Sequence, residues 1–360
     1  GSQTLMDSSR FVGPLTLAYV GEASAALIRG SRFDDKVDVG GISTKCLRPG
    51  SSLLLESNQF NATVQFRYCP MYSANVTFAK NTFNSSIAFG TAQFSGCNVS
   101  LIDNTIRSAP LSTSPAISFD TSPSHVGTFQ KWKNNKIDSS FGSGGGVVFD
   151  KTSQLNIGAT LQMSGNTVTS GDNQHSFFML QNGGQLLIDN TNTFTSDFQV
   201  QYTSGAIGDV IHLKNCPALR SFRIRGVGRR VCGSFGCRTI TASLTDSSIT
   251  IEDSHLLVGD GLVQVQFNGA LINCAFVVSN SELKRVHVSS AAKAPEGRRS
   301  RATLTGAKVT TSVEVKCNSG FVSVDQDSRL PPTVSLTRCT VSDLLAFHAG
   351  WHPQQEFTSD

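Results

Sequence analysis

The feature of this sequence that most constrains its fold is a short pattern that recurs along the chain. Its clearest copy places apolar residues at Val76 and Phe78, an asparagine at Asn81 and a further apolar residue at Phe83. Apolar residues two apart follow the period of a β-strand, not that of a helix. Repetition at this length is typical of solenoids, in which each copy buries its apolar face against its neighbours.

The asparagine position, here called the anchor, recurs at intervals of 23 to 34 residues. Asparagine anchors are Asn58, Asn81, Asn104, Asn135, Asn166, Asn192 and Asn215. Weaker copies have Ser31, Ser247, Ser281, Ala307 and Cys339 in this place. The variable interval suits coils with a constant strand–turn–strand part and loops of different length. We predict an all-β parallel β-helix (solenoid) of about twelve coils over residues 25–342. Residues 1–24 are expected to form an N-terminal cap or incomplete coil. Residues 343–360 are expected to form a C-terminal tail or cap that begins with a helical turn.

We expect each anchor asparagine to form a corner between two strands. Asparagine enters the left-handed helical region more readily than most residues with a side chain, so one such residue can turn the chain. If every coil places it at the same corner, the amides can stack into a hydrogen-bonded ladder, as they do in cross-β assemblies. Small residues at Ser281, Ala307 and Cys339 would weaken this ladder.

These copies resemble the single-stranded right-handed parallel β-helix of the pectin-lyase-like superfamily. The resemblance implies a right-handed solenoid, which agrees with the usual hand of parallel crossovers. It does not select a function, because that fold hosts lyases, hydrolases, tailspikes and adhesins. The Ser/Thr-rich, cysteine-dotted coils at residues 274–283 and 334–344 are also similar to trypanosomatid surface proteins of the dispersed gene family. That similarity implies a fragment of a larger adhesive surface protein whose membrane anchor lies elsewhere.

The cysteine content points to an oxidising compartment. The chain has nine cysteines and no zinc-finger spacing, so disulfides in an extracellular or cell-surface protein are the preferred interpretation. Cys46 and Cys69 are one coil length apart and could bond between coils, while Cys232 and Cys237 bracket a glycine-rich turn and could close it. No apolar run is long enough to span a membrane.

Four N-x-S/T sequons cluster within residues 61–98. The glycosylation candidates are Asn61, Asn75, Asn84 and Asn98. The composition alone predicts a similar number of sequons, so only their clustering is informative.

Two basic segments are the candidates for ligand binding. One lies within residues 220–238 and the other within residues 284–301. The candidate ligand-binding residues are Arg220, Arg223, Arg225, Arg229, Arg230, Arg298, Arg299 and Arg301. Arginine pairs with sulfate, carboxylate or phosphate, so a glycan or an extracellular protein ligand is the expected partner. Solvated loops without a partner are the other interpretation. A net charge of +4 does not indicate a nucleic-acid binder.

No complete catalytic signature is present. Pectinolytic hydrolases of this fold share clustered aspartates, Gly-His-Gly and Arg-x-Lys, and the last two are absent here. Asp325 and Asp327 could form a carboxylate pair, although a role in capping a turn is preferred. His348 and His352 have a helical metal spacing without a third ligand, so neither a metal nor a cofactor is predicted. The sequence favours a non-enzymatic surface or adhesion module. The alternative is a polysaccharide lyase or glycoside hydrolase whose carboxylates come from distant coils.

Overall fold

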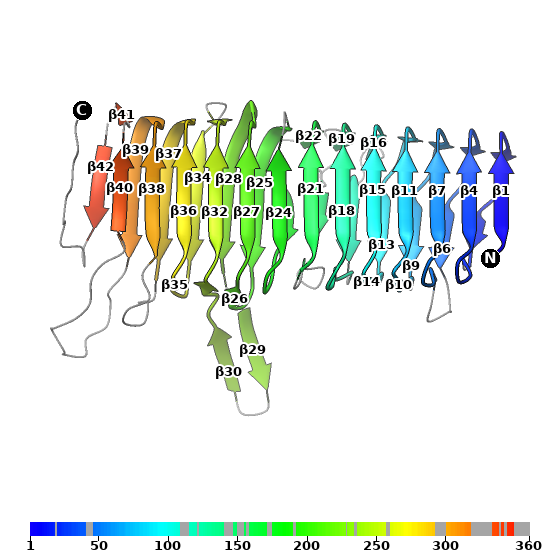
Figure 1. Ribbon diagram of the computed structural model, residues 1–360, viewed down its shortest axis with the longest axis horizontal. Coiled ribbons are helices and arrows are strands. Elements are labelled where there is room, and N and C mark those ends of the chain that lie inside the picture. Colours follow the sequence, from blue (N-terminus) through cyan, green and yellow to red (C-terminus); the bar gives the residue numbers. More distant parts are fainter. Residues whose placement is uncertain are drawn as a thin grey trace. The chain divides into compact units, whose positions relative to one another are not determined.

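The computed structural model shows an all-β parallel solenoid of about ten turns (Figure 1). The described residues are 1–18, 20–40, 46–108, 115–120, 122–139, 147–149, 155, 158–170, 175–189, 192–227, 229–233, 236–256, 260–291, 300–317, 333–337, 340–341 and 344–348. Within these ranges there is no helix. The predicted fold class is therefore confirmed, with slightly fewer turns than the twelve expected. The last predicted anchor, Cys339, lies outside the described residues.

The chain divides into an N-terminal unit, Gly1–Met179 with Asn190–Ser196, and a C-terminal unit, Leu180–Asp189 with Asp197–Asp360. One sheet of the N-terminal unit has the parallel order β1 (Gln3–Asp7), β4 (Ala25–Arg29), β7 (Ser52–Glu56), β11 (Asn75–Ala79), β15 (Asn98–Ile102), β18 (Phe129–Lys133) and β21 (Thr160–Ser164). After the anchor corner come β2 (Arg10–Phe11), β5 (Arg32–Phe33), β8 (Gln59–Phe60), β12 (Thr82–Phe83), β16 (Thr105–Arg107), β19 (Lys136–Ser139) and β22 (Thr167–Ser170). The next side contains β3 (Leu15–Leu17), β6 (Val37–Gly40), β9 (Val64–Arg67), β13 (Ile87–Gly90), β17 (Ile117–Asp120), β20 (Val147–Phe149) and β23 (His175–Met179). A short parallel pair, β10 (Met71–Tyr72) with β14 (Phe94–Ser95), completes two of these turns.

The C-terminal unit repeats this plan. One sheet contains β24 (Gln185–Asp189), β27 (Val210–Lys214), β32 (Ser248–Glu252), β36 (Ala275–Ser279), β38 (Arg301–Thr305) and β40 (Thr333–Thr337). Another side contains β28 (Ala218–Gly226), β33 (His255–Leu256), β34 (Leu262–Phe267), β37 (Glu282–Ser290), β39 (Lys308–Cys317), β41 (Thr340–Val341) and β42 (Leu344–His348). The strand β25 (Thr193–Tyr202) enters this unit at Asp197. A third side is formed by β26 (Ala206–Ile207), β31 (Leu244–Thr245) and β35 (Leu271–Ile272), and an antiparallel hairpin by β29 (Arg229–Gly233) and β30 (Gly236–Ile240).

The structure describes strands near both ends of the chain. Residues 3–17 form strands that pair in parallel with the following turn. The helical turn expected at Asp343–His348 is wrong, because Leu344–His348 is the strand β42, which pairs with β39.

A ladder of asparagine amides runs through the N-terminal unit. Each anchor oxygen Oδ1 accepts the backbone N–H of the preceding anchor at 2.9–3.0 Å. Each Nδ2 donates to a backbone carbonyl of the preceding turn at 2.8–2.9 Å. The buried ladder residues are Asn58, Asn81, Asn104, Asn135, Asn166 and Asn192. The amides thus satisfy backbone groups that the corner removes from the sheets.

The residue that turns the corner is not the one predicted. Three residues that directly precede anchors, Ser57, Lys80 and Asp103, have φ of 54° to 55°. The anchor asparagines that follow them do not have positive φ. The anchor side chain can therefore point inward while its neighbour takes the left-handed conformation. The expectation that asparagine itself adopts that conformation is wrong for these turns.

Asn215 is the exception, and it is not a ladder residue. It has φ of 51° and is exposed, while Cys216 after it is buried in the ladder position. The Cys216 N–H is accepted by the Ser254 hydroxyl, and the Ser254 N–H by Ser281. Ser247 lies at a different corner, where its hydroxyl accepts the N–H of Asp209. Asn215 therefore has the left-handed corner conformation predicted for an anchor asparagine but no place in the ladder. The anchor at Ser247 is assigned to the wrong corner, whereas Ser281 continues the ladder through its hydroxyl.

Stacked aromatic rings fill the core beside the asparagine ladder. Phe11, Phe33, Phe60 and Phe83 form one column with ring centroids 4.7–4.9 Å apart and nearly parallel planes. A second column contains Phe66, Phe89 and Phe119. Stacked rings add about 0.5–1.5 kcal/mol per pair beyond area burial. The inward residue after each anchor therefore also fixes the register of the turns.

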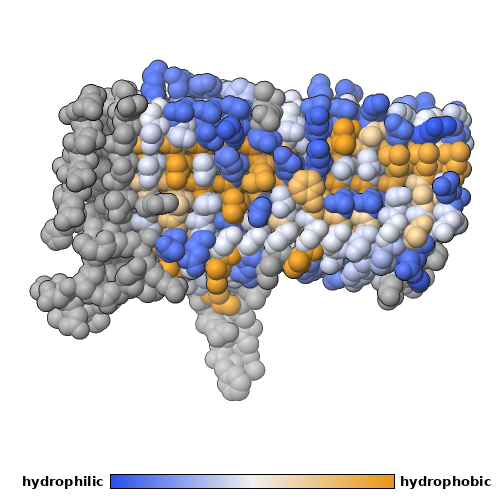
Figure 2. All heavy atoms as spheres, in the orientation of Figure 1, coloured by the Kyte–Doolittle hydropathy of each residue, from blue (hydrophilic) through white to orange (hydrophobic). Residues whose placement is uncertain are grey.

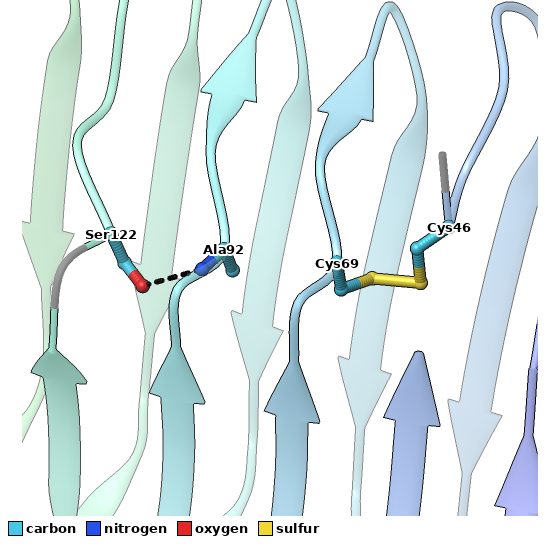
Figure 3. Close-up of a disulfide and its surroundings, with 4 residues drawn as sticks. All are labelled: Cys46, Cys69, Ala92 and Ser122. Atoms are coloured by element: carbon cyan, nitrogen blue, oxygen red, sulfur yellow. Dashed lines mark hydrogen bonds between the residues drawn. A yellow bond between two sulfur atoms is a disulfide. The ribbon is translucent and has the colours of Figure 1, made fainter. Parts of the chain in front are cut away.

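The predicted disulfide between Cys46 and Cys69 is present and connects adjacent turns (Figure 3). The same column continues with Ala92 and Ser122, where the Ser122 hydroxyl accepts the Ala92 N–H at 2.9 Å. A covalent bond and a hydrogen bond thus occupy equivalent places in successive turns.

The outer surface also carries rows of equivalent residues. Figure 2 shows apolar side chains aligned across neighbouring strands of the N-terminal unit. Leu5, Leu27 and Leu54 share one outward register position on β1, β4 and β7. Rows on the surface are thus a direct product of the in-register stacking.

Candidate ligand-binding face

The C-terminal unit presents a two-row array of polar side chains on β28, β34 and β37. The first row contains Arg223, Gln264 and His287, and the second contains Arg225, Gln266 and Ser289. The residues between the rows are Ile224, Val265 and Val288, and all three are buried. Strand alternation therefore directs the six polar side chains outward. We call these six residues the polar face.

Arg223 is held by carboxylates from the turns on either side. Its Nη2 lies 3.1 Å from Asp197 Oδ2, on β25, and 3.6 Å from Asp260 Oδ2, on the turn before β34. The Arg223 side chain is 18% exposed and that of Asp197 10%, so this pair is shielded from solvent. Two carboxylates compensate the Arg223 charge and fix its position.

Arg225 has no such compensation. Its Nη2 donates to Gln264 Oε1 at 3.2 Å, and no ion pair joins it within the described ranges. Its Nε is buried without a hydrogen-bond partner among those residues. Burial lowers the pKa of the Arg225 guanidinium, and repulsion by Arg223 lowers this pKa further, against a smaller opposing effect of Asp197. The Nε of Arg223 is buried without a partner as well, so the two arginines differ in charge compensation. A bound anion would relieve both effects on Arg225, which makes its guanidinium the uncompensated cation of this face.

Amides and a hydroxyl complete the polar face. Gln264 Nε2 donates to Gln266 Oε1 at 3.2 Å, and His287 Nε2 lies 3.1 Å from Ser289 Oγ. Gln266 is exposed and the other five members of the face are half-buried. Such groups can both donate to and accept from ligand hydroxyls. No group of three or more His, Cys, Asp or Glu that could hold a metal ion occurs among the residues that the structure describes.

The predicted basic segments are only partly brought together. Arg223 and Arg225 share one strand face, as their spacing predicts, and Arg220 lies earlier on β28. Arg229, Arg230 and Arg238 belong to the β29–β30 hairpin, of which only the backbone is described. Arg298 and Arg299 lie outside the described residues, as do Asp325, Asp327 and His352. Arg301 is the first residue of β38, and only its backbone is described.

Sequence reasoning missed the carboxylates and amides of this face. Asp197, Arg223 and Asp260 come from three successive turns, and no short motif links them. The only available signal is the strand register, which requires each turn to be aligned correctly.

The other predicted residues are the second cysteine pair and the sequon asparagines. Cys232 and Cys237 are direct cross-strand neighbours in the hairpin, although their side chains are not described. Among the sequon asparagines, Asn75 and Asn98 are exposed, whereas Asn61 and Asn84 are half-buried.

Comparison with known proteins does not assign the chain to a family: no family model, curated protein or solved structure matches it. Because the described residues form no helix, none of them provides a helical membrane span.

Proposed function

We propose that this chain is a non-enzymatic adhesion module that binds acidic glycans through the polar face of its C-terminal unit. The observation that carries the proposal is Arg225, a half-buried guanidinium whose charge is not paired with a carboxylate among the described residues. A sulfate or uronate group fits this arginine, because both pair with guanidinium in a planar, charge-assisted geometry.

The rest of the polar face suits a polymer more than a single anion. Gln264, Gln266, His287 and Ser289 continue the array over two further turns at a spacing of about 4.8 Å. They offer hydrogen-bonding groups to sugar hydroxyls beyond the charged group. An array on a sheet surface of this kind can follow an extended chain along successive turns.

We further propose that the chain works outside the cell or on its surface, and that its solenoid is of the right-handed pectin-lyase-like type. The Cys46–Cys69 disulfide supports the location, because such bonds persist in oxidising compartments. A relationship with the dispersed gene family of trypanosomatid surface proteins would place its membrane anchor in another part of a larger protein.

An alternative function is a polysaccharide lyase or glycoside hydrolase. It is favoured by the two carboxylates, Asp197 and Asp260, that approach Arg223 from adjacent turns. Glycoside hydrolysis needs two carboxyl groups on opposite sides of the scissile bond. Both carboxylates here are instead directed at one arginine, which favours a structural role for the pair.

The test compares Arg225→Ala with Arg67→Ala for binding to an array of sulfated and uronate-containing glycans. Arg67 is an exposed arginine of the N-terminal unit, so its removal changes the net charge equally. Loss of a charge-assisted hydrogen bond costs about 1.5–3 kcal/mol, so Arg225→Ala should weaken binding by about 10- to 100-fold. Arg67→Ala should change it by less than about two-fold. Equal losses of glycan binding in the two variants would show that the polar face is not the binding site.

Two further arms separate the alternatives. A triple change of Arg298, Arg299 and Arg301 to alanine tests the second basic segment; it should retain most of the binding if the polar face is the site. Incubation with polygalacturonate and calcium tests the enzymatic function. Turnover that is lost in Asp197→Asn and Asp260→Asn variants would establish the enzyme in place of the adhesion module.

A further inference from the structure

The four sequons form two pairs with different surroundings. Asn75 and Asn98 are the first residues of β11 and β15 and are register partners in adjacent turns. Both are exposed, and the valine after each is buried. Strand alternation therefore directs the hydroxyl residues of these sequons, Thr77 and Ser100, to the same outer face as the asparagines. Each complete acceptor motif is thus displayed on an open sheet surface.

Asn61 and Asn84 instead belong to a polar network. Asn84 Nδ2 donates to Asn61 Oδ1 at 2.9 Å, and Asn61 Nδ2 donates to Asp34 Oδ1 at 2.7 Å. Hydrogen bonds from Arg32 and Arg10, together with that from Asn61, lower the pKa of Asp34 to about 2. The network spans three turns of the N-terminal unit.

The hydroxyl residues of these two sequons are also engaged. Thr63 Oγ1 lies 3.1 Å from the Ser85 hydroxyl and 3.4 Å from that of Ser86, and both serines are buried to more than nine-tenths. A sugar on Asn61 or Asn84 would have to be accommodated inside this packed set of side chains.

We propose that Asn75 and Asn98 are the N-glycan acceptors of this chain, and that Asn61 and Asn84 are structural. In the transfer, the asparagine Nδ2 bonds to the anomeric carbon of an oligosaccharide carried on a lipid diphosphate. The bond from that carbon to the diphosphate oxygen breaks, the amide nitrogen loses one proton, and the lipid diphosphate leaves. One N–H remains on Nδ2, so Asn98 can still donate to Asn75 Oδ1, a bond of 2.9 Å here.

The surroundings of Asn98 favour an attached sugar further. Its register partner in the next turn is Phe129, an outward-facing ring that is 36% exposed. The apolar face of the first sugar can cover this ring, which removes aromatic surface from water. Glycans on Asn75 and Asn98 would lie side by side on adjacent strands.

The experiment maps glycopeptides by mass spectrometry after expression of the chain in a secreting eukaryotic host. The wild type should carry glycans on Asn75 and Asn98 and none on Asn61 or Asn84. An Asn75→Gln/Asn98→Gln variant should lose all enzymatically removable glycan mass, while Asn61→Gln/Asn84→Gln should keep it. Folded, secreted protein with sugar on Asn61 or Asn84, or without sugar on both Asn75 and Asn98, would overturn the proposal.

Unglycosylated protein from a bacterial host gives a second readout. The thermal midpoint of Asn75→Gln/Asn98→Gln should stay within about one degree of the wild type. That of Asn61→Gln/Asn84→Gln should fall by about 2 °C or more, because two members of the network are lost. An equal shift in both variants would contradict the structural role of Asn61 and Asn84. If the second variant is not secreted, the wild-type glycopeptide map alone decides the acceptor sites. Neither readout depends on polyanion binding, so it can fail independently of the proposed function.

Discussion

Replacing Asn104 by alanine tests how much of the fold depends on the amide ladder. The Asn104 residue is 1% exposed. Its Oδ1 accepts the Asn81 N–H at 2.9 Å, and its Nδ2 donates to the Phe78 carbonyl at 2.9 Å. Alanine retains the backbone N–H that donates to Asn135 Oδ1. It leaves the Asn81 N–H and the Phe78 carbonyl buried without these partners.

The expected loss follows from those two groups. A buried donor or acceptor without a partner costs about 1–3 kcal/mol, so the free energy of unfolding should fall by about 2–6 kcal/mol. The space left by the carboxamide adds to this cost, because packed interiors relax only partly around a cavity.

Urea unfolding followed by circular dichroism measures this loss, and native-state hydrogen exchange of the Asn81 amide localises it. Asn215→Gly is the matched control, since Asn215 is exposed and its φ of 51° is one that glycine adopts freely. The control should change the free energy of unfolding by about 0.5 kcal/mol or less. If Asn104→Ala costs less than about 1 kcal/mol, or no more than the control, the ladder does not stabilise the turns as argued.

Two other predictions concern a buried charge and the disulfide. Burial raises the pKa of Asp209 from 3.8 to about 6, although the N–H groups of Gly183 and Gly184 oppose the rise. The raised pKa stabilises the fold fully below about pH 4, and this contribution disappears as the pH rises through 6. Asp209→Asn should therefore be more stable than wild type by up to about 3 kcal/mol at pH 7.5 and equal to it near pH 4; a difference that does not change with pH would contradict this reasoning. Changing Cys46 and Cys69 to serine should lower the free energy of unfolding by about 3 kcal/mol, from the loop that the bond closes. Under reducing conditions wild type and variant should unfold at similar urea concentrations, and a persisting gap would show that the serines disturb the packing.

The sequence predicts the turns well where the local chemistry is repeated without change. From Asn58 to Asn192 the spacing of apolar residues and asparagine identifies the ladder, because both inward rows and the corner amide are required in every turn. The one-residue error about the left-handed position has a physical cause. Several residue types, including Ser57 and Lys80, tolerate that conformation, so it leaves little trace in composition.

The assignments fail where two corners have the same chemistry. Asp246 before Ser247 and Asp253 before Ser254 both have positive φ and both precede a buried serine. Periodicity alone cannot distinguish these two corners. The repeat is therefore assigned to Ser247, one corner before Ser254, which is the residue in the ladder position.

The polar face could be predicted only in part. The shared face of Arg223 and Arg225 follows from strand alternation within one short segment. The carboxylates Asp197 and Asp260 could not be placed beside Arg223, because the loops between turns differ in length. The same limit applies to the sequons, whose motif is local although their exposure depends on neighbouring turns.

The equivalence of successive turns has a consequence for how such a chain can change length. Asn81 and Asn104 lie in consecutive turns, and Thr82 and Thr105 occupy the same register position. Residues 82–104 are therefore one complete structural unit, and an in-frame deletion joins Asn81 to Thr105 with every corner and column preserved. Duplication of the same segment adds a turn by the same logic. Recombination within a gene of this kind can lengthen or shorten the N-terminal unit by whole turns, so the length of that unit can evolve separately from the polar face of the C-terminal unit.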